Sequence, residues 1–309
     1  MNGKARRHWS VTERRDARFA WLRAGALGCS IAAAALAVTS CAGAPSTSPV
    51  STAGAPVHSG QAGDRARAVR VRMVAVRDTF AACEQRLEAA RGGLPTMAVV
   101  GASYTAGVGP DKPALSWAAD LARNLRWDAV IYGVSGAGYV QTGTYGAGPM
   151  ARQLGAEQLP GLSPSLVIVQ AGYDDVQVPP GLERQQVDRT IKLIRTEAPH
   201  AAIGLVTVFA STARPIPAGF YHIDATIVAA ARAADPNAII MDPLAGQWTY
   251  QHAHHGLHPT VAGDAWIAGK VGAILHAHGI ASHPGGTAPI ICDAGVAGSI
   301  SAPDSDPRA

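Results

Sequence analysis

The sequence predicts an α/β fold with a parallel sheet of about five strands and helices on both faces of the sheet. Two observations lead to this expectation. From Pro95 onward, short continuous apolar runs alternate with stretches of helical periodicity, which is typical of strands buried on both faces. The 309 residues are 48% hydrophobic and 16% charged, a composition that argues against a disordered, collagenous or multi-span membrane protein.

The first forty residues are typical of an export signal. Residues 1–23 are basic, and no charge interrupts the small apolar run from Ala24 to Ser40. The run ends in Val38-Thr39-Ser40-Cys41, which resembles the bacterial lipobox, where the chain is cut before a cysteine that is acylated. We therefore expect a signal peptide over 1–40, lipidation of Cys41, and a lipoprotein at the outer face of the cytoplasmic membrane. The alternative is an uncleaved transmembrane helix, although an Ala/Gly/Ser-rich run is weakly hydrophobic for that role.

The net charge argues against a nucleic-acid partner. The formal charge of +4 comes from the first forty residues, which contribute +5 and leave −1 for the rest of the chain. A nucleic-acid-binding domain needs a basic patch on its folded part. We expect a membrane contact through the N-terminal lipid, and otherwise a monomer.

The segment between Cys41 and the domain falls into two parts. Residues 41–63 are rich in Pro, Ser, Gly and Ala and predict a flexible tether. Residues 64–93 predict a helical lead-in that ends at Gly92-Gly93, because apolar residues recur at spacings of three and four. These residues are Val69, Met73, Val76, Phe80, Cys83 and Leu87.

Residues 94–280 predict the α/β domain itself. The expected strands are Thr96–Val100, Ala129–Tyr132, Ser165–Gln170, Ile203–Phe209 and Ala238–Met241. The expected helices are Ala114–Arg126, Pro180–Glu197, Tyr221–Ala234 and Thr260–His278. A Pro/Gly/Ala-rich tail follows over 281–309. Cys83 and Cys292 are the two cysteines that remain after the expected signal peptide and Cys41. Because an exported chain lies in an oxidising compartment, we expect a disulfide between them that joins lead-in and tail, with two free thiols as the alternative.

The loops that follow the strands carry the candidate functional residues, because ligands of parallel sheets bind at the carboxyl ends of the strands. Ser103 stands in Gly101-Ala102-Ser103 after the first strand, and Gly136 in a glycine-rich loop after the second. Gly172-Tyr173-Asp174-Asp175 follows the third. His255-Gly256-Leu257-His258-Pro259-Thr260 precedes the last helix.

Four such loops in this order resemble the SGNH/GDSL hydrolase family over roughly residues 95–280. The resemblance implies a three-layer, flavodoxin-like sheet with Ser103 as nucleophile and His258 as base. It implies an oxyanion hole made by the backbone N–H groups of Ser103 and Gly136 and by the side chain at position 174. The activity implied is ester hydrolysis through an acyl-enzyme, with no cofactor and no metal.

Three positions depart from the family's pattern. The usual Gly-Asp-Ser is Gly-Ala-Ser here. Asp174 stands where the family has asparagine, and it can donate a hydrogen bond only when protonated. His255 stands where the family has the aspartate that orients the histidine, so the candidate orienting groups are His255, Asp242 or a backbone carbonyl.

The sequence thus predicts an exported esterase or deacylase acting on an ester of an envelope lipid or glycan. The alternative is a catalytically silent lipoprotein that keeps the crevice to bind an acylated glycan or a partner. The histidines of residues 251–258 could bind zinc, but no carboxylate or thiolate accompanies them at fixed spacing.

Overall fold

The computed structural model describes residues 80–90, 93–110, 112–146, 148–157, 159–212, 214–254 and 256–293. The expected signal peptide, Cys41, the tether, residues 64–79, His255 and the tail beyond 293 lie outside these ranges. No helix within them is long and apolar enough to cross a bilayer.

The sheet has six strands, all parallel, in the order β5-β4-β3-β1-β2-β6. The strands are β1 (Thr96–Gly101), β2 (Asp128–Gly133), β3 (Leu166–Gln170), β4 (Ala202–Val206), β5 (Ile239–Met241) and β6 (Ile291–Asp293). The first five confirm the expected strands, and their order is that of flavodoxin-like sheets with β6 added beside β2. The sheet therefore confirms the predicted fold class.

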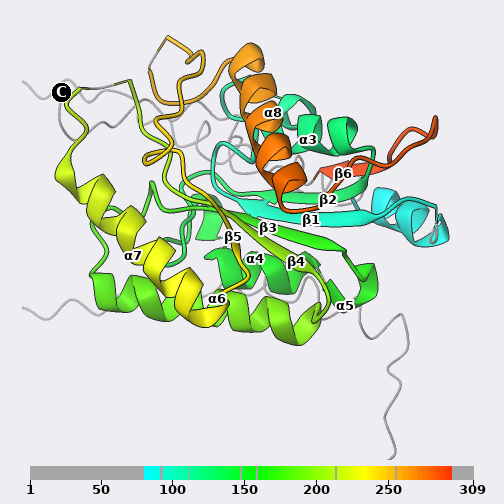
Figure 1. Ribbon diagram of the computed structural model, residues 1–309, viewed down its shortest axis with the longest axis horizontal. Helices are drawn as coiled ribbons and strands as arrows, with labels where there is room; N and C mark the ends of the chain where they lie inside the picture. The colour runs from blue at the N-terminus through cyan, green and yellow to red at the C-terminus, as the bar shows by residue number, and fades with distance from the viewer. Residues whose placement is uncertain are drawn as a thin grey trace, which may run out of the picture. The chain divides into compact units, whose positions relative to one another are not determined.

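Helices cover both faces of the sheet, as Figure 1 shows. One face carries α3 (Trp117–Leu125) and α8 (Val261–Ala277). The other carries α4 (Met150–Glu157), α5 (Leu159–Leu162), α6 (Pro180–Glu197) and α7 (Ala218–Ala234). The described part of the chain also contains two short 3-10 turns, η1 (Pro113–Leu115) and η2 (Thr144–Gly146). The main core lies between the sheet and the first pair of helices.

The local sequence explains where α3 begins and which side it buries. The Ser116 side chain accepts a hydrogen bond from the Ala119 N–H, which caps the first turn and separates α3 from η1. Trp117, Leu121 and Leu125 recur every four residues and are buried against the sheet. The helix ends at Arg126, whose φ of 55° is left-handed. The single helix expected over 114–126 is therefore interrupted at its capping serine.

β4 ends earlier than the strand that was expected from its apolar run. The expected strand continued to Phe209, but the observed strand ends at Val206. The Val208 N–H donates to Asp224 Oδ1 at 3.2 Å, so a side chain takes the place of a strand neighbour. Phe209 instead stacks on Tyr104, with ring centroids 4.3 Å apart.

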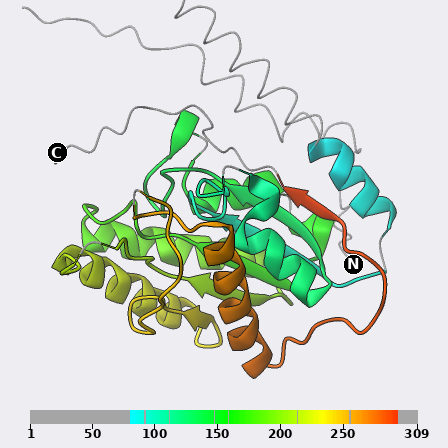
Figure 2. The same ribbon diagram turned by 90° about the horizontal axis from the view of Figure 1, so that it is seen from above.

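β6 lies in the segment expected to be a tail. The Ala129 N–H donates to the Ile290 carbonyl at 2.9 Å, and the Ile290 N–H donates to Asp128 Oδ1 at 2.8 Å, which brings residues 291–293 alongside β2. The expected disulfide between Cys83 and Cys292 is present, with the two Cα atoms 5.5 Å apart. It joins the helical segment 80–89 to β6, which lie side by side in Figure 2.

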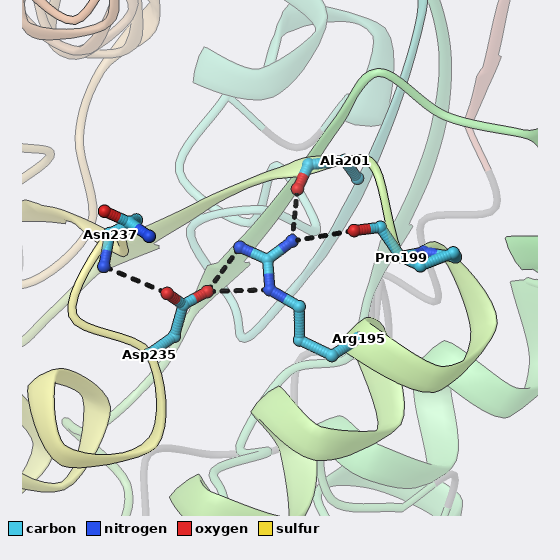
Figure 3. Close-up of polar contacts among 5 residues, drawn as sticks. All are labelled: Arg195, Pro199, Ala201, Asp235 and Asn237. Carbon is cyan, nitrogen blue, oxygen red and sulfur yellow. Dashed lines mark hydrogen bonds and ion pairs between the residues drawn. The ribbon is translucent and has the colours of Figure 1, made fainter.

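An ion pair ties α6 to α7 at the amino ends of β4 and β5 (Figure 3). Arg195 Nε donates to Asp235 Oδ2 at 2.7 Å, and Nη1 donates to the Ala201 carbonyl at 2.6 Å. The other oxygen of Asp235 accepts the Asn237 N–H at 2.9 Å. The guanidinium thus fixes the turns that enter both strands, at the end of the sheet opposite to the loops that carry the candidate site.

Candidate active site

Ser103 follows β1 directly, at the carboxyl edge of the sheet. β1 lies between β2 and β3, the place where the strand order reverses and where open parallel sheets bind their ligands. Ser103 is 9% exposed. Its hydroxyl forms no hydrogen bond with the described part of the chain. Catalytic serine–histidine bonds are often long without substrate and shorten when it binds.

The loop of Ser103 is held from β3 by Gln170. The buried Gln170 Oε1 accepts the Ala102 N–H at 3.1 Å and the Thr105 hydroxyl at 3.0 Å. Gly101 makes this closeness feasible, because a Cβ there would lie 2.1 Å from Thr105 Oγ1. The sequence analysis missed Gln170. Its one signal is an amide at the end of an otherwise apolar strand.

Gly136 lies in the loop after β2, which packs on the Ser103 loop. A Cβ on Gly133 would lie 2.2 Å from the Ala106 nitrogen, and the Val134 N–H donates to the Gly101 carbonyl at 2.9 Å. Gly136 has a φ of +76°, which favours glycine. Among the described residues, neither the Ser103 nor the Gly136 N–H has an acceptor. These two N–H groups are thus available to an oxyanion.

Asp175 anchors the loop that carries Gly136. Its carboxylate accepts the N–H groups of Tyr139 at 2.6 Å, Gln141 at 3.0 Å and Val140 at 3.3 Å. A Cβ on Gly138 would lie 2.0 Å from Asp175 Oδ2, so only glycine fits there. Burial raises the pKa of Asp175, and the three N–H donors oppose that rise. Asp175 is therefore a structural anchor beside the candidate site.

Asp174 is half-buried at the third candidate position of the oxyanion hole. Burial, and then the charge of Asp175, raise the pKa of Asp174 to about 7. A carboxyl group with this pKa keeps a proton in part of the molecules at neutral pH. In that form it can donate a hydrogen bond, as the amide of asparagine does.

His258 lies against the loop of Ser103. Its ring centroid is 5.6 Å from that of Tyr104, the residue after the candidate nucleophile. A Cβ on Gly109 would lie 3.2 Å from His258 Cβ and 1.9 Å from the Pro259 carbonyl oxygen, so the two loops pack backbone to backbone. The structure thus brings the His258 loop and the Ser103 loop together.

Asp242, one of the three candidate orienting groups, lies after β5. Its Oδ1 accepts the Ala245 N–H at 2.8 Å. Its other neighbour is the buried Asp224, whose pKa is raised to about 6 by burial and by the nearby Asp242, against the hydrogen bond that the Val208 N–H donates. Within the described ranges, Asp242 forms no hydrogen bond with His258.

The loops at the carboxyl edge of β1, β2 and β3 bring together groups that suit one type of reaction. They supply a hydroxyl, two N–H groups that have no acceptor among the described residues, a carboxyl group with a pKa of about 7 and an imidazole. Within the described residues, no three His, Cys, Asp or Glu side chains are grouped as metal ligands. This set suits nucleophilic attack on a carbonyl, with donors for the oxygen that becomes charged.

Solved structures similar to this chain include hydrolases. TesA is 22% identical over 58% of this chain and 97% of its own, with a TM-score of 0.45. A carbohydrate esterase family 2 enzyme with a carbohydrate binding domain, from Corynascus thermopiles (Myceliophthora fergusii), is 18% identical over 60% of this chain and 67% of its own, with a TM-score of 0.47. A putative lipolytic protein of the G-D-S-L family from Desulfitobacterium hafniense is 16% identical over 58% of this chain and 98% of its own, with a TM-score of 0.44.

No curated protein matches the chain in sequence. The family described as GDSL-like Lipase/Acylhydrolase matches residues 99–266, which is more than half of the chain and includes all four loops. The chain therefore belongs to the GDSL-like lipase/acylhydrolase family, as its motifs indicate.

Proposed function

We propose that the chain is an exported serine esterase or deacylase that hydrolyses an ester of an envelope lipid or glycan through Ser103 and His258. The observation that carries this proposal is the pair of N–H groups of Ser103 and Gly136, which lie on loops packed together and have no acceptor among the described residues. Location at the envelope, through a lipid on Cys41, is inferred from residues 1–41 alone. The substrate class follows from that location.

In the proposed reaction, the His258 imidazole takes the proton of the Ser103 hydroxyl while Oγ bonds to the ester carbonyl carbon. The carbonyl oxygen becomes an oxyanion that accepts hydrogen bonds from the two N–H groups and from protonated Asp174. The C–O bond to the alcohol then breaks, and the alcohol leaves with the proton held by His258. Water then attacks the acyl-enzyme and gives a proton to His258. His258 passes this proton to Ser103 Oγ as the bond between Oγ and the acyl carbon breaks, which releases the acid and the free serine.

Hydrolysis of short p-nitrophenyl esters by the purified protein tests the proposal, with Ser103→Ala prepared alongside. We expect turnover by the wild type and a loss of at least about a thousandfold in kcat for the variant. Equal thermal transitions would show that both proteins are folded. Turnover that survives the loss of Ser103 would refute the assignment of the nucleophile.

The second candidate function is a catalytically silent envelope lipoprotein that binds an acylated glycan or a partner. The observation that favours it is Asp174, since an ionised carboxylate at that position would repel an oxyanion. A folded wild type with no turnover between pH 5 and 9, and with binding to an acetylated glycan unchanged by Ser103→Ala, would select this candidate.

A further inference from the structure

Tyr104 lies at the point where the loops of Ser103 and His258 meet. Its ring is 2% exposed and stacks parallel to that of Phe209, with centroids 4.3 Å apart. On its other sides lie the rings of Tyr250, edge-on at 6.4 Å, and His258, tilted at 5.6 Å. The sequence places Tyr104 directly after the candidate nucleophile, so its backbone and that of Ser103 move together.

The Tyr104 hydroxyl reaches across to the histidine loop. It donates a hydrogen bond to the backbone carbonyl of Leu257, the residue before His258. It also lies 3.1 Å from the Tyr250 hydroxyl. A phenol has one proton to donate, so Tyr250 is the donor in that second bond. The two bonds form a directed chain from Tyr250 through Tyr104 to the Leu257 carbonyl.

The loop that receives this chain is tightly fixed at its other contacts. The Ala253 N–H donates to the His258 carbonyl at 2.8 Å, and the Thr260 N–H donates to the Gln251 carbonyl at 2.9 Å. The Tyr250 ring stacks on that of His252 with centroids 4.3 Å apart. The bond from Tyr104 thus fixes the backbone next to His258 with respect to the backbone of Ser103.

We infer that Tyr104 is a positioning residue that sets the His258 imidazole against Ser103, and that Tyr250 orients the Tyr104 hydroxyl for that task. This inference rests on the proposed function, since it assigns the placement of the proposed base. Neither phenol touches substrate in this assignment. Both act through the backbone of the His258 loop.

Both phenol hydroxyls keep the proton that their hydrogen bonds require. Burial raises the pKa of Tyr104 well above its ordinary value, with contributions from Tyr250, Tyr173 and Asp264. Burial also raises the pKa of Tyr250, together with the charge of Asp264. Both hydroxyls therefore stay protonated throughout the pH range of an esterase assay, and the two hydrogen bonds persist over that range.

The first test is the kinetics of Tyr104→Phe, which keeps the stacked ring and removes the bond to Leu257. We expect kcat to fall about tenfold with KM nearly unchanged, because the base is displaced while the substrate's own contacts remain. Tyr250→Phe should have a smaller effect. In the double variant the second substitution should add nothing, because Tyr250 acts only through the Tyr104 hydroxyl.

A matched control separates positioning from a general loss of stability. Ile194→Val removes one buried methyl group near the end of α6, at the amino edge of the sheet, and should lower the thermal transition without lowering kcat. The inference is overturned if Tyr104→Phe keeps the wild-type kcat, if it loses no more activity than Ile194→Val at equal stability, or if the two tyrosine substitutions are additive.

A second readout does not depend on turnover. The proton resonances of the His258 ring, assigned by their loss in His258→Gln, can be titrated in the wild type and in Tyr104→Phe. We expect the variant to show a displaced titration midpoint, because the ring has moved relative to its neighbours. An inactive wild type would refute the proposed function, whereas an unchanged titration of His258 in the variant would refute the positioning role of Tyr104.

Discussion

Glu183 is a buried acid whose two carboxyl oxygens have no hydrogen-bond partner among the described residues. It lies in the first turn of α6 and faces Asp175 and Tyr139. Burial, and then the charge of Asp175, raise the pKa of Glu183 from 4.5 to about 9. A neutral Glu183 leaves the negative charge on Asp175, whose carboxylate accepts hydrogen bonds from three N–H groups.

The raised pKa of Glu183 predicts a loss of stability with rising pH. Between pH 4.5 and about 9, the folded protein holds a proton on Glu183 that the unfolded chain releases, so the free energy of unfolding falls as the pH rises. Glu183→Gln removes this dependence. We expect its melting temperature to exceed that of the wild type by about 5 °C or more at pH 8, with a smaller difference at pH 5.

Thermal unfolding of both proteins across this pH range measures the effect. Asp188→Asn is the matched control, since Asp188 lies on the same helix but is only partly buried and is paired with Lys192 at 2.8 Å. The same pH slope in wild type and Glu183→Gln would show that Glu183 does not hold its proton.

Asp174 predicts a pH-dependent rate. In the proposed mechanism Asp174 donates to the oxyanion only when protonated, so the proposed contribution is present below its pKa of about 7 and is lost above it. Asp174→Asn donates at every pH. We expect a rate within a few-fold of wild type at pH 5.5 and at least about tenfold faster at pH 8.5.

The pH profile of kcat/KM for Asp174→Asn and wild type on one short ester supplies the measurement. Asp188→Asn again supplies the control for the loss of one negative charge. A ratio of the two rates that stays constant from pH 5.5 to 8.5 would exclude Asp174 from the oxyanion hole.

At this scale, the sequence could predict residues that stand at fixed places relative to strands. Ser103, Gly136, Asp174 and His258 come from that reasoning, and their catalytic roles stay predictions. The contacts of Tyr104 and Gln170 could not be found this way, because the Tyr104 hydroxyl meets a carbonyl 153 residues further along the chain and Gln170 meets Ala102 68 residues earlier. Such contacts depend on the completed fold.

The loop between β2 and α4 shows how one element supports the candidate site. It curls around the Asp175 carboxylate, and Gly138 permits the close approach. Gly138→Ala places a Cβ 2.0 Å from Asp175 Oδ2, which must move and give up its N–H donors. We expect kcat to fall at least about tenfold and the melting temperature to fall as well.

Gly155→Ala is the matched control for Gly138→Ala. Gly155 lies in α4, nothing lies within 4 Å of its Cβ position, and alanine there should raise the melting temperature slightly at unchanged kcat. Activity and thermal transitions of both variants, measured together, make the comparison. Wild-type kcat in Gly138→Ala would show that activity does not depend on Asp175 holding the loop between β2 and α4.

The sequence predicted the long helix α6 to the residue, but it did not predict the short elements α4 and β6. The expected bounds of α6 coincide with the observed Pro180–Glu197, because eighteen residues of helical periodicity follow a proline that starts the helix. α4 escaped prediction because it is short, contains Gly155 and buries few apolar side chains, among them Met150 and Leu154. β6 has three residues in a segment whose composition is that of a tail.

On the scale of the whole molecule, the Cys83–Cys292 disulfide closes a segment of 209 residues. A cross-link over so long a loop restricts the unfolded chain strongly, which stabilises the folded state by about 4 kcal/mol. We expect Cys83→Ser/Cys292→Ser to melt at least about 8 °C lower than the wild type. Its kcat at a temperature where both are folded should be nearly unchanged, because the disulfide lies away from the candidate site.

Melting curves of the wild type with and without a reductant provide the measurement, and the double serine variant provides the control that no reductant should affect. An oxidised wild type that melts at the same temperature as the double variant would contradict this role of the disulfide.

The place of β6 has a consequence for the order in which the chain folds. β2 receives its outer neighbour from residues 291–293, after every other strand has been synthesised. Until then Ala129, Val130 and Ile131 form an open edge of the sheet, the kind of surface on which two nascent chains can pair wrongly. A ribosome that stalls before Ile291 would therefore release a chain prone to aggregate although its four candidate loops are complete.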